Sequence, residues 1–279
     1  MTGSDPVRPD VLLVGCGRLG SAVGLRLAER GHRVAGIRRR AEDVPPPIVP
    51  VPADLTREEP ALPPLDLDLL LVALTARPRS EDAYRATYLD GMLRALDAVE
   101  AQGARPRRAV LVSSTAVHGD PRPGADPDVD EDTPPDPRDA PARVLLAAEE
   151  AFLARLPHGT VLRLSGLYGP GRPRVADEVL AGQVIDPLRW TNRIHRDDAA
   201  AAAVHLLTLD VDPGPVYLGT DDEPALKRDV AAHVAGLLGV APPPPVDPHD
   251  GHGKRLSNAR LRATGWTPAY PTYREGYAP

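Results

Sequence analysis

The chain has 279 residues and a formal net charge of -6. This length is enough for one large domain, or for a domain with a smaller additional part, around a full buried core. The acidic balance and the lack of a basic tail argue against a nucleic-acid partner. No run of about 18 apolar residues is present, which argues against a membrane span, and the polar N-terminus has no signal-peptide core, so we expect a cytoplasmic protein.

Apolar runs alternate with helix-like stretches along the chain. This order predicts an α/β fold, a doubly wound parallel sheet with helices on both faces. The expected strands are residues 11–14, 33–37, 48–51, 67–73, 109–112 and 161–164. We expect two loops rich in proline: Gly119 to Pro141, which would lie over a ligand cleft, and Pro242 to Pro245, a stiff connector.

An amphipathic stretch from Ser80 to Gly103 predicts a long helix. Tyr84, Tyr88, Met92 and Leu96 recur in it at helical spacing. Such a stripe is more typical of a face packed on the core than of a binding site, so we expect these four side chains to be core residues.

A glycine-rich segment directly follows the first expected strand. Gly15, Gly17 and Gly20 have the spacing G-x-G-x-x-G and precede a helix-like stretch that runs to Arg30. The first glycine allows a tight turn, the second lets backbone amides approach a pyrophosphate, and the third lets the helix pack closely on the strand. The positive end of the helix then meets the phosphates. The segment therefore predicts a dinucleotide cofactor.

Cys16, inside this loop, is the only cysteine of the chain. An intrachain disulfide and a thiolate zinc cluster are therefore excluded, and we expect Cys16 to fill a small space in the loop. No H-E-x-x-H motif or comparable ligand spacing is present, so we expect no metal.

The end of the second expected strand indicates which cofactor is used. Sites that prefer NAD place an acidic residue there, on the ribose hydroxyl, whereas an arginine accommodates the 2′-phosphate of NADP. Here Ile37 is followed by Arg38, Arg39 and Arg40, with Arg18 in the glycine loop as a second contact. NADP is the favoured cofactor, NAD the alternative, and a merely solvated arginine cluster is the remaining interpretation.

Several motifs stand together in the order of a known family. They are the glycine loop 15–20, Ala-Asp-Leu at 53–55, and the segments 112–119, 162–171, 193–198 and 216–219. With these motifs the chain resembles the extended short-chain dehydrogenase/reductases, the NAD-dependent epimerase/dehydratase family. The resemblance implies a Rossmann-type dinucleotide-binding domain over residues 9–170, on which a strand and helix near 194–218 pack, and a smaller substrate-binding part over residues 171–279. The resemblance places the cofactor against eight residues: Gly15, Gly17, Arg18, Leu19, Gly20, Arg38, Arg39 and Asp54. For Asp54, helix capping is the alternative role.

The chain departs from this family at its catalytic pair. The family uses a tyrosine and, four residues later, a lysine, but Lys227 and Lys254 are the only lysines and neither has a tyrosine four residues before it. If Glu149 is aligned with the glutamate common on that helix, Pro141 and Leu145 occupy the two catalytic positions. Arg143 in the same segment could offer a fixed positive charge or be a solvated helix residue. The sequence is thus an atypical member of the family it resembles.

Other polar residues could take over catalysis. Ser113, Ser114 and Thr115 follow the fifth expected strand, where the family's hydroxyl binds the reacting oxygen, and Tyr168 follows the sixth. His118 has a side chain suited to proton transfer near neutral pH, with a packing role as the alternative. We expect His195 and Asp198 to be structural.

Two functions stay open from the sequence. The first is an NADP-dependent oxidoreductase or epimerase/dehydratase-type enzyme acting on a small polar metabolite, in which Ser114 with His118 or a water replaces the missing tyrosine. The second is a nucleotide-binding module or a non-redox enzyme that keeps the cofactor site without hydride turnover. In both cases the partner is a small molecule, and a homodimer is compatible with the sequence.

Overall fold

A computed structural model of the protein describes residues 8–122, 126–171, 175–244 and 251–277. The described residues form two compact units. The first comprises those within Met1–Val117, Pro137–Arg163 and Ala200–Val216, and the second those within His118–Asp136, Leu164–Ala199 and Tyr217–Pro279.

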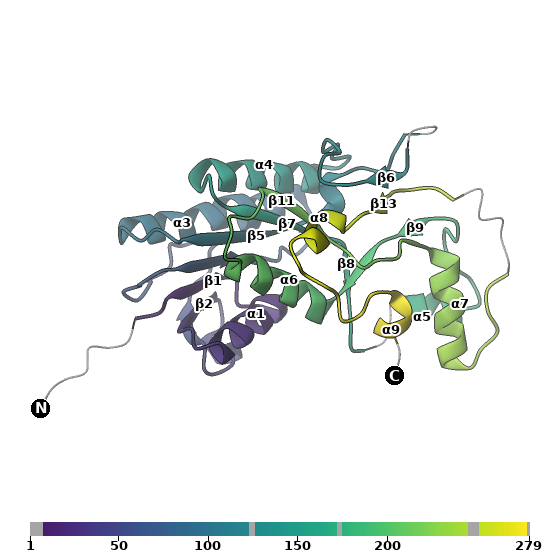
Figure 1. Ribbon diagram of the computed structural model, residues 1–279, viewed down its shortest axis with the longest axis horizontal. Helices are drawn as coiled ribbons and strands as arrows, with labels where there is room; N and C mark the ends of the chain where they lie inside the picture. The colour runs from purple at the N-terminus through teal and green to yellow at the C-terminus, as the bar shows by residue number, and fades with distance from the viewer. Residues whose placement is uncertain (1–7, 123–125, 172–174, 245–250, 278–279) are drawn as a thin grey trace, which may run out of the picture. The chain divides into compact units, whose positions relative to one another are not determined.

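A seven-stranded sheet forms the centre of the dinucleotide-binding fold (Figure 1). Its strand order is β3-β2-β1-β4-β5-β7-β11. The strands are β1 Val11–Val14, β2 Val34–Arg38, β3 Val49–Pro52, β4 Leu69–Val72, β5 Arg108–Ser114, β7 Thr160–Leu164 and β11 Val216–Gly219. β1 pairs in parallel with β2 and β4, as do β2 with β3 and β4 with β5. The order reverses between β1 and β4, as in the Rossmann fold, which confirms the predicted fold class.

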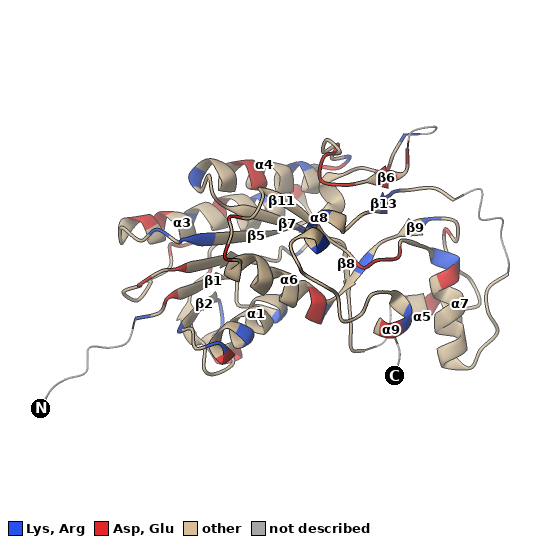
Figure 2. Cartoon of the chain, in the orientation of Figure 1, with Lys and Arg blue, Asp and Glu red and all other residues tan. Residues whose placement is uncertain are grey.

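Helices cover both faces of this sheet. α3 (Met92–Ala101) and α4 (Ala140–Arg155) lie on one face, and α1 (Arg18–Glu29) and α6 (Arg196–Thr208) lie on the other (Figure 1). β1 and β4 are buried over their whole length, which explains why both are apolar without alternation. Acidic and basic residues occur along α4, whereas those of α7 are confined to its start (Figure 2).

The main core lies between the sheet and α3 with α4. Leu12 and Val14 of β1 belong to one buried cluster with Met92, Leu96 and Phe152. On the other face, Gly24 of α1 is so close to the sheet that a Cβ there would lie 2.6 Å from Leu13 Cδ1. Each of these helices therefore turns its apolar side chains, or a glycine, toward the sheet face that it covers.

The second unit is built from short elements. α5 (Val175–Leu180) and α7 (Lys227–Leu238) share a buried cluster with Tyr273. Three two-stranded pairs accompany them: β8 Gly166–Tyr168 with β10 Arg193–His195, β9 Trp190–Thr191 with β12 Ala225–Leu226, and β6 Asp128–Val129 with β13 Arg255–Leu256. The remaining helices of this unit are α8 Ala259–Ala263 and α9 Tyr273–Gly276.

The structure corrects three expectations about the elements. The stretch from Ser80 to Gly103 is helical as expected, but as three consecutive segments: α2 (Glu81–Tyr84), the π-helical η2 (Arg85–Gly91) and α3. Met92 and Leu96 are buried as expected, whereas Tyr84 and Tyr88 are only half-buried. The expected loop Gly119–Pro141 contains β6, and α4 already begins at Ala140. The fifth strand extends to Ser114, so that Ser113 and Ser114 end it rather than follow it.

Two further expectations concern the proline-rich connector and membrane spans. Of the expected connector, residues 242–244 are irregular, and Pro245 lies outside the described residues. Within the described residues, no helix is both long enough and apolar enough to span a membrane.

Candidate functional site

The glycine loop joins β1 to α1 with the geometry that the sequence predicts. Gly15 has a φ of +102°, and a Cβ there would lie 2.5 Å from the carbonyl oxygen of Ala73 on the neighbouring segment. A Cβ on Gly20 would lie 2.1 Å from the carbonyl oxygen of Gly15. These two glycines are therefore required by the fold itself.

Gly17 differs from these two glycines. It is the N-cap residue of α1, and no atom lies within 4 Å of a Cβ built on it. No side chain caps α1, and its first turn holds no acidic residue. The amides of Arg18, Leu19 and Gly20 therefore form the open positive end of a helix, the arrangement that binds phosphate. These residues fit the pyrophosphate of a dinucleotide.

Cys16 is buried beneath this loop, as expected. Its backbone N–H donates to Ile37 O at 2.8 Å, and a Cβ on Gly36 would lie 2.9 Å from its sulfur. Burial raises the pKa of the Cys16 thiol. The side chain fills space between β1 and β2, and its thiol is not activated.

Arg38 ends β2 and is held by its neighbours. Its Nη1 donates to the carbonyl oxygens of Cys16 and Asp43, each at 2.9 Å, and its Nη2 donates to Asp43 Oδ2 at 3.0 Å. Arg40 Nη2 lies 2.6 Å from the same carboxylate oxygen. Arg39 and Arg18 are exposed, and neither forms a side-chain hydrogen bond or ion pair with the part of the chain that the structure describes. The guanidinium of Arg38 is thus fixed at the end of the strand next to the glycine loop.

Asp54 follows β3 and is the first residue of a turn, which its side chain stabilises by hydrogen bonds to Thr56. Its Oδ1 accepts hydrogen bonds from the backbone N–H of Thr56 at 3.1 Å and from the Thr56 hydroxyl at 2.7 Å. The hydroxyl bond is the main reason that the pKa of Asp54 is lowered. No helix begins here, so Asp54 holds a turn and does not take the helix-capping role that the sequence offered as an alternative.

Ser113 belongs to a buried polar cluster in the first unit. Its hydroxyl donates to Glu149 Oε1 at 2.5 Å, and Glu149 Oε2 lies 2.7 Å from Arg163 Nη2. Glu149 and Arg163 are 2% and 5% exposed. Ser114 is differently placed, because its Oγ accepts from the backbone N–H of Ala116 at 3.2 Å and keeps its proton for another partner. Thr115, the first residue of the 3₁₀ turn η3 (Thr115–Val117), is buried.

The segment that would carry the family's catalytic pair is the start of α4. Asp139 caps this helix, with Oδ1 accepting from Ala142 N–H at 2.8 Å, and Pro141 lies in its first turn. Leu145 is buried and Arg143 is exposed. Neither Pro141 nor Leu145 offers an ionisable group.

The other candidate residues lie in the second unit. His118 is 2% exposed, and its carbonyl oxygen accepts a hydrogen bond from Lys254 Nζ. Tyr168 is buried, its hydroxyl donates to Thr272 O at 3.2 Å, and burial is the main cause that raises its pKa. A tyrosine in this state is a poor acid near neutral pH.

His195 and Asp198 have the surroundings of structural residues. The Nδ1 of His195 accepts from Asp197 N–H at 3.2 Å, and burial lowers the pKa of the ring. Asp198 accepts from the backbone N–H groups of Ala269 at 2.7 Å and Tyr270 at 3.0 Å. It thereby fixes a distant segment of the same unit.

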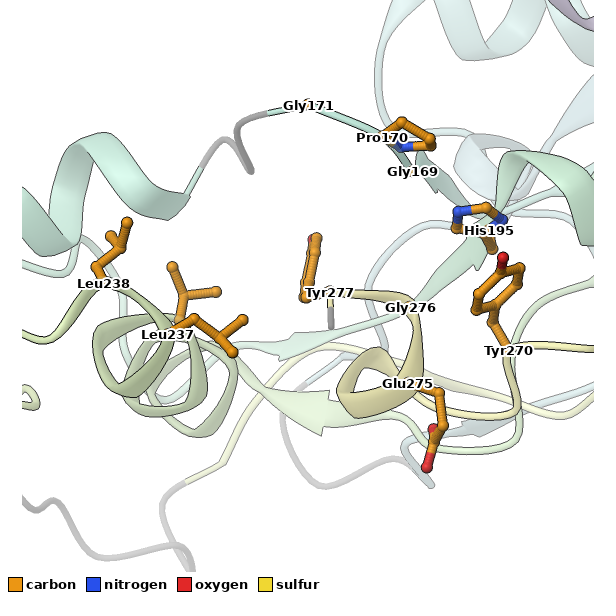
Figure 3. Close-up of a pocket in the computed structure, with 11 residues that line it drawn as sticks. Gly169, Pro170, Gly171, His195, Leu237, Leu238, Tyr270, Glu275, Gly276 and Tyr277 are labelled. Atoms are coloured by element: carbon orange, nitrogen blue, oxygen red, sulfur yellow. The ribbon is translucent and has the colours of Figure 1, made fainter. Parts of the chain in front are cut away.

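The second unit also contains a cavity of about 590 Å³ (Figure 3). Its walls combine aromatic rings, aliphatic side chains of α7 and a glycine-rich rim. They are formed by Gly169, Pro170, Gly171, His195, Val234, Leu237, Leu238, Tyr270, Glu275, Gly276 and Tyr277. The carboxylate of Glu275 is engaged with Thr272 in a capping box. Such walls suit a small ligand with a flat apolar part.

Lys254 is a partly buried lysine that the sequence did not single out. It lies immediately before β13, in a segment without a motif, and only its fold contact with His118 draws attention to it. The only feature of the sequence that could have drawn attention to Lys254 is that the chain has just two lysines.

Comparison with known proteins identifies the family. The profile of the NAD-dependent epimerase/dehydratase family matches residues 11–218. The chain belongs to this family. The match includes the glycine loop and runs into β11, which confirms the resemblance seen in the sequence.

Individual relatives agree with this assignment. A curated protein of a Streptomyces species, 3-diazoavenalumate denitrifying reductase, is 31% identical, and the alignment covers 95% of this chain and 98% of that protein. A structure from Methylobacillus flagellatus, described as a NAD-dependent epimerase/dehydratase, is 34% identical with a TM-score of 0.80 and 97% coverage of both chains. The UDP-glucose 4-epimerase of Thermus thermophilus, solved with NAD, shares 22% identity, a TM-score of 0.73 and coverage of 95% of this chain and 96% of that chain, and it supports the fold alone.

Proposed function

We propose that the protein is an NADP-dependent reductase that delivers hydride to a small polar metabolite without a tyrosine as proton donor. The observation that carries this proposal is the open helix end at Gly17, and it is combined with the expectation that Pro141 and Leu145, which offer no acid, occupy the dyad positions. A chain that keeps the cradle and lacks the acid suits a hydride transfer that requires no acid at that position.

The cofactor would be held by residues of the first unit. The open amides at the start of α1 would bind the pyrophosphate, and Asp54 would lie near the adenine. The fixed guanidinium of Arg38, with the exposed side chain of Arg39, would bind the 2′-phosphate. When bound, NADPH supplies a hydride from its nicotinamide ring.

The substrate class follows from the missing acid and from one relative. Reduction of a carbonyl creates an oxyanion, which needs a proton donor. Reduction of a diazonium carbon needs no proton donor. The electron pair of the hydride forms the new C–H bond, and the electron pair of the broken C–N bond leaves with N₂. The negative charge of the hydride neutralises the positive charge of the diazonium group. The Streptomyces relative is named for the removal of nitrogen from a diazo compound, and that compound is a carboxylate. We therefore propose an arenediazonium compound that bears a carboxylate as the substrate, since its cationic form balances the reaction without a proton.

A carbonyl substrate is the second candidate, and it would need a different acid. Ser114 has a free proton to donate at the end of β5, and His118 follows four residues later. We propose that, with such a substrate, His118 donates the proton and Ser114 relays it, with Thr115 as an alternative hydroxyl. Ser113 is a weaker candidate because Glu149 holds its hydroxyl, and Tyr168 is a weaker one because its pKa is raised. Arg143 would contribute charge only.

The proposal is tested with purified protein, NADPH deuterated on the transferred position, an arenediazonium carboxylate and a panel of carbonyl compounds. NADPH oxidation, N₂ release and deuterium in the product are measured, with a reaction lacking protein as the control. We expect protein-dependent oxidation with one N₂ released and one deuterium incorporated at the former C–N carbon.

Other outcomes would correct the proposal in definite ways. Oxidation with carbonyl compounds alone would assign the second substrate class and leave the reductase in place. Saturable NADPH binding without any oxidation would instead support the nucleotide-binding module. Tighter binding of NADH than of NADPH would overturn the cofactor preference.

A further inference from the structure

A row of aromatic rings borders the cavity of the second unit. The ring of His195 lies 3.8 Å from that of Tyr270, between centroids, and it meets Tyr168 edge-on at 5.4 Å. Tyr168 in turn lies 4.7 Å from the ring of Tyr277. Figure 3 shows His195, Tyr270 and Tyr277 beside the open space of the cavity. Because neighbouring rings support one another, the cavity has flat apolar surfaces in fixed orientations.

Two leucines at the end of α7 form another wall of the cavity. Figure 3 shows Leu237 and Leu238 on the opposite side of the open space from His195 and Tyr270. The two leucines are 45% and 41% exposed, which are large fractions for side chains of this kind. Covering apolar surface of this kind is favourable, so a ligand with an apolar ring would be stabilised by contact with both leucines.

His195 supplies a polar group to these apolar walls. The residue is 3% exposed, and its Nδ1 accepts a hydrogen bond from Asp197 N–H, so the neutral ring carries its proton on Nε2. Within the described part of the chain, Nε2 has no hydrogen-bond partner. A Cβ on Gly169, at the rim of the cavity, would lie 3.1 Å from Nε2. The missing side chain at Gly169 therefore leaves this N–H open to the cavity, where an acceptor on a ligand would satisfy it.

The walls disfavour a charged ligand. Among the described residues that line the cavity, none is a lysine or arginine, and Glu275 is the only acidic one. Its carboxylate already accepts hydrogen bonds from the backbone N–H and the hydroxyl of Thr272. Burial lowers the pKa of His195, which keeps its ring neutral near pH 7. An anion would therefore lose its hydration without gaining a counter-charge, and a cation would find only a carboxylate that is already engaged.

We propose that this cavity binds an uncharged aromatic ring system that carries a hydrogen-bond acceptor, and that the acceptor receives the Nε2–H of His195. The ring system would lie between the aromatic wall and the two leucines of α7. The inference goes beyond the proposed function, because it concerns the second unit alone and involves neither the cofactor nor a hydride transfer. His195 then has a binding role in addition to its structural contacts.

Two probes of nearly the same shape test this proposal. Indole and 7-azaindole are both bicyclic and uncharged at neutral pH, but only 7-azaindole has a ring nitrogen that accepts a hydrogen bond. Protein labelled with ¹⁵N-histidine is titrated with each probe, and the ¹⁵N signal of His195 Nε2, assigned with the variant His195→Phe, is followed by NMR. We expect 7-azaindole to shift this signal in a saturable way and indole to shift it much less, because indole leaves the N–H without an acceptor.

Affinities measured by the same titrations test the donor and the wall separately. We expect the wild-type protein to bind 7-azaindole about five- to tenfold more tightly than indole, and His195→Phe, which keeps an aromatic ring, to bind the two probes equally. His158→Phe, at an exposed position of the first unit, is the control and should keep the wild-type preference. Leu238→Asp should weaken both probes about tenfold. Leu180→Asp, which changes an equally exposed leucine outside the cavity, should leave both affinities unchanged.

Three results would overturn the inference: no response of the His195 Nε2 signal at millimolar 7-azaindole, equal affinities of the two probes for the wild-type protein, or an unchanged preference for 7-azaindole in a folded His195→Phe variant. Circular dichroism checks the fold of each variant. If His195→Phe does not fold, the comparison of the two probes on the wild-type protein and the loss of affinity in Leu238→Asp still decide the matter.

Discussion

Glu149 and Arg163 form an ion pair inside the first unit, with 2.7 Å between Oε2 and Nη2, and the Ser113 hydroxyl donates to the same carboxylate. Glu149 lies on the helix that would carry the family's catalytic lysine, and Arg163 lies on β7. The pair thus ties α4 to the sheet.

We expect Glu149→Ala to lower the free energy of unfolding by about 3–5 kcal/mol, because Arg163 would remain buried without its partner. Glu150→Ala is the matched control, since Glu150 is the next residue on α4 and is exposed. Urea unfolding of both variants measures the difference. If Glu149→Ala and Glu150→Ala lose the same free energy of unfolding, the ion pair does not hold α4 on the sheet.

Asp221 predicts a pH dependence of stability. It is 1% exposed, and burial raises its pKa to about 8. Between about pH 4 and pH 8 the unfolded chain ionises this carboxyl while the folded chain keeps it protonated, so unfolding releases a proton and stability falls as pH rises. We expect Asp221→Asn to remove this fall, which makes the variant more stable than wild type at pH 8 and comparable at pH 4.

Urea unfolding at the two pH values tests this expectation. Asp210→Asn, at an exposed position, serves as the control and should follow the wild-type curve. An Asp221→Asn variant whose stability difference from wild type is the same at pH 4 and pH 8 would mean that Asp221 titrates normally in the folded protein.

Gly17→Leu should abolish dinucleotide binding in a protein that still folds. The position has no atom within 4 Å of a built Cβ and a φ of -82°, so the fold accepts a side chain there, whereas the pyrophosphate would collide with it. Gly236→Leu is the control, because Gly236 also has open space and lies on α7. Calorimetry with NADPH measures both, and unchanged affinity in Gly17→Leu would remove the dinucleotide site.

Arg38→Ala should reduce the preference for NADP over NAD. A charge-assisted bond between an arginine and a phosphate contributes about 1.5–3 kcal/mol, so the ratio of the two Kd values should change by roughly tenfold or more. Arg33→Ala, before the other end of β2, is the control, since Arg33 donates to Arg8 O. A ratio that stays constant in Arg38→Ala would contradict the assignment of the 2′-phosphate to this guanidinium.

The sequence predicts the central sheet well because each parallel strand is buried on both faces. A continuous apolar run such as Val11–Val14 or Leu69–Val72 is favourable only in the buried centre of a sheet that helices cover on both faces. The roles of Gly15 and Gly20 were also predictable, because close backbone contacts leave no room for a side chain at either position. Fixed spacing and local sterics therefore define the cofactor cradle.

Contacts between distant segments could not be predicted in this way. Lys254 and His118 are 136 residues apart, and β6 pairs with β13 across a similar distance. The role of Ser113 depends on Glu149 of α4 and Arg163 of β7, which are distant from it in the sequence. Pairings of this kind depend on tertiary packing, which local propensity does not encode.

The last prediction separates the two substrate classes by pH. With a carbonyl substrate, the rate should depend on the protonation of His118, and His118→Ala should remove that pH dependence. Either His118→Ala or Ser114→Ala should then lose about 10²-fold or more in kcat, because no acid remains at the dyad positions. With a diazonium substrate, neither change should alter the rate greatly, since the leaving N₂ takes no proton. Full activity of both variants on a carbonyl substrate would assign the proton to another group, with Tyr168 as the next candidate.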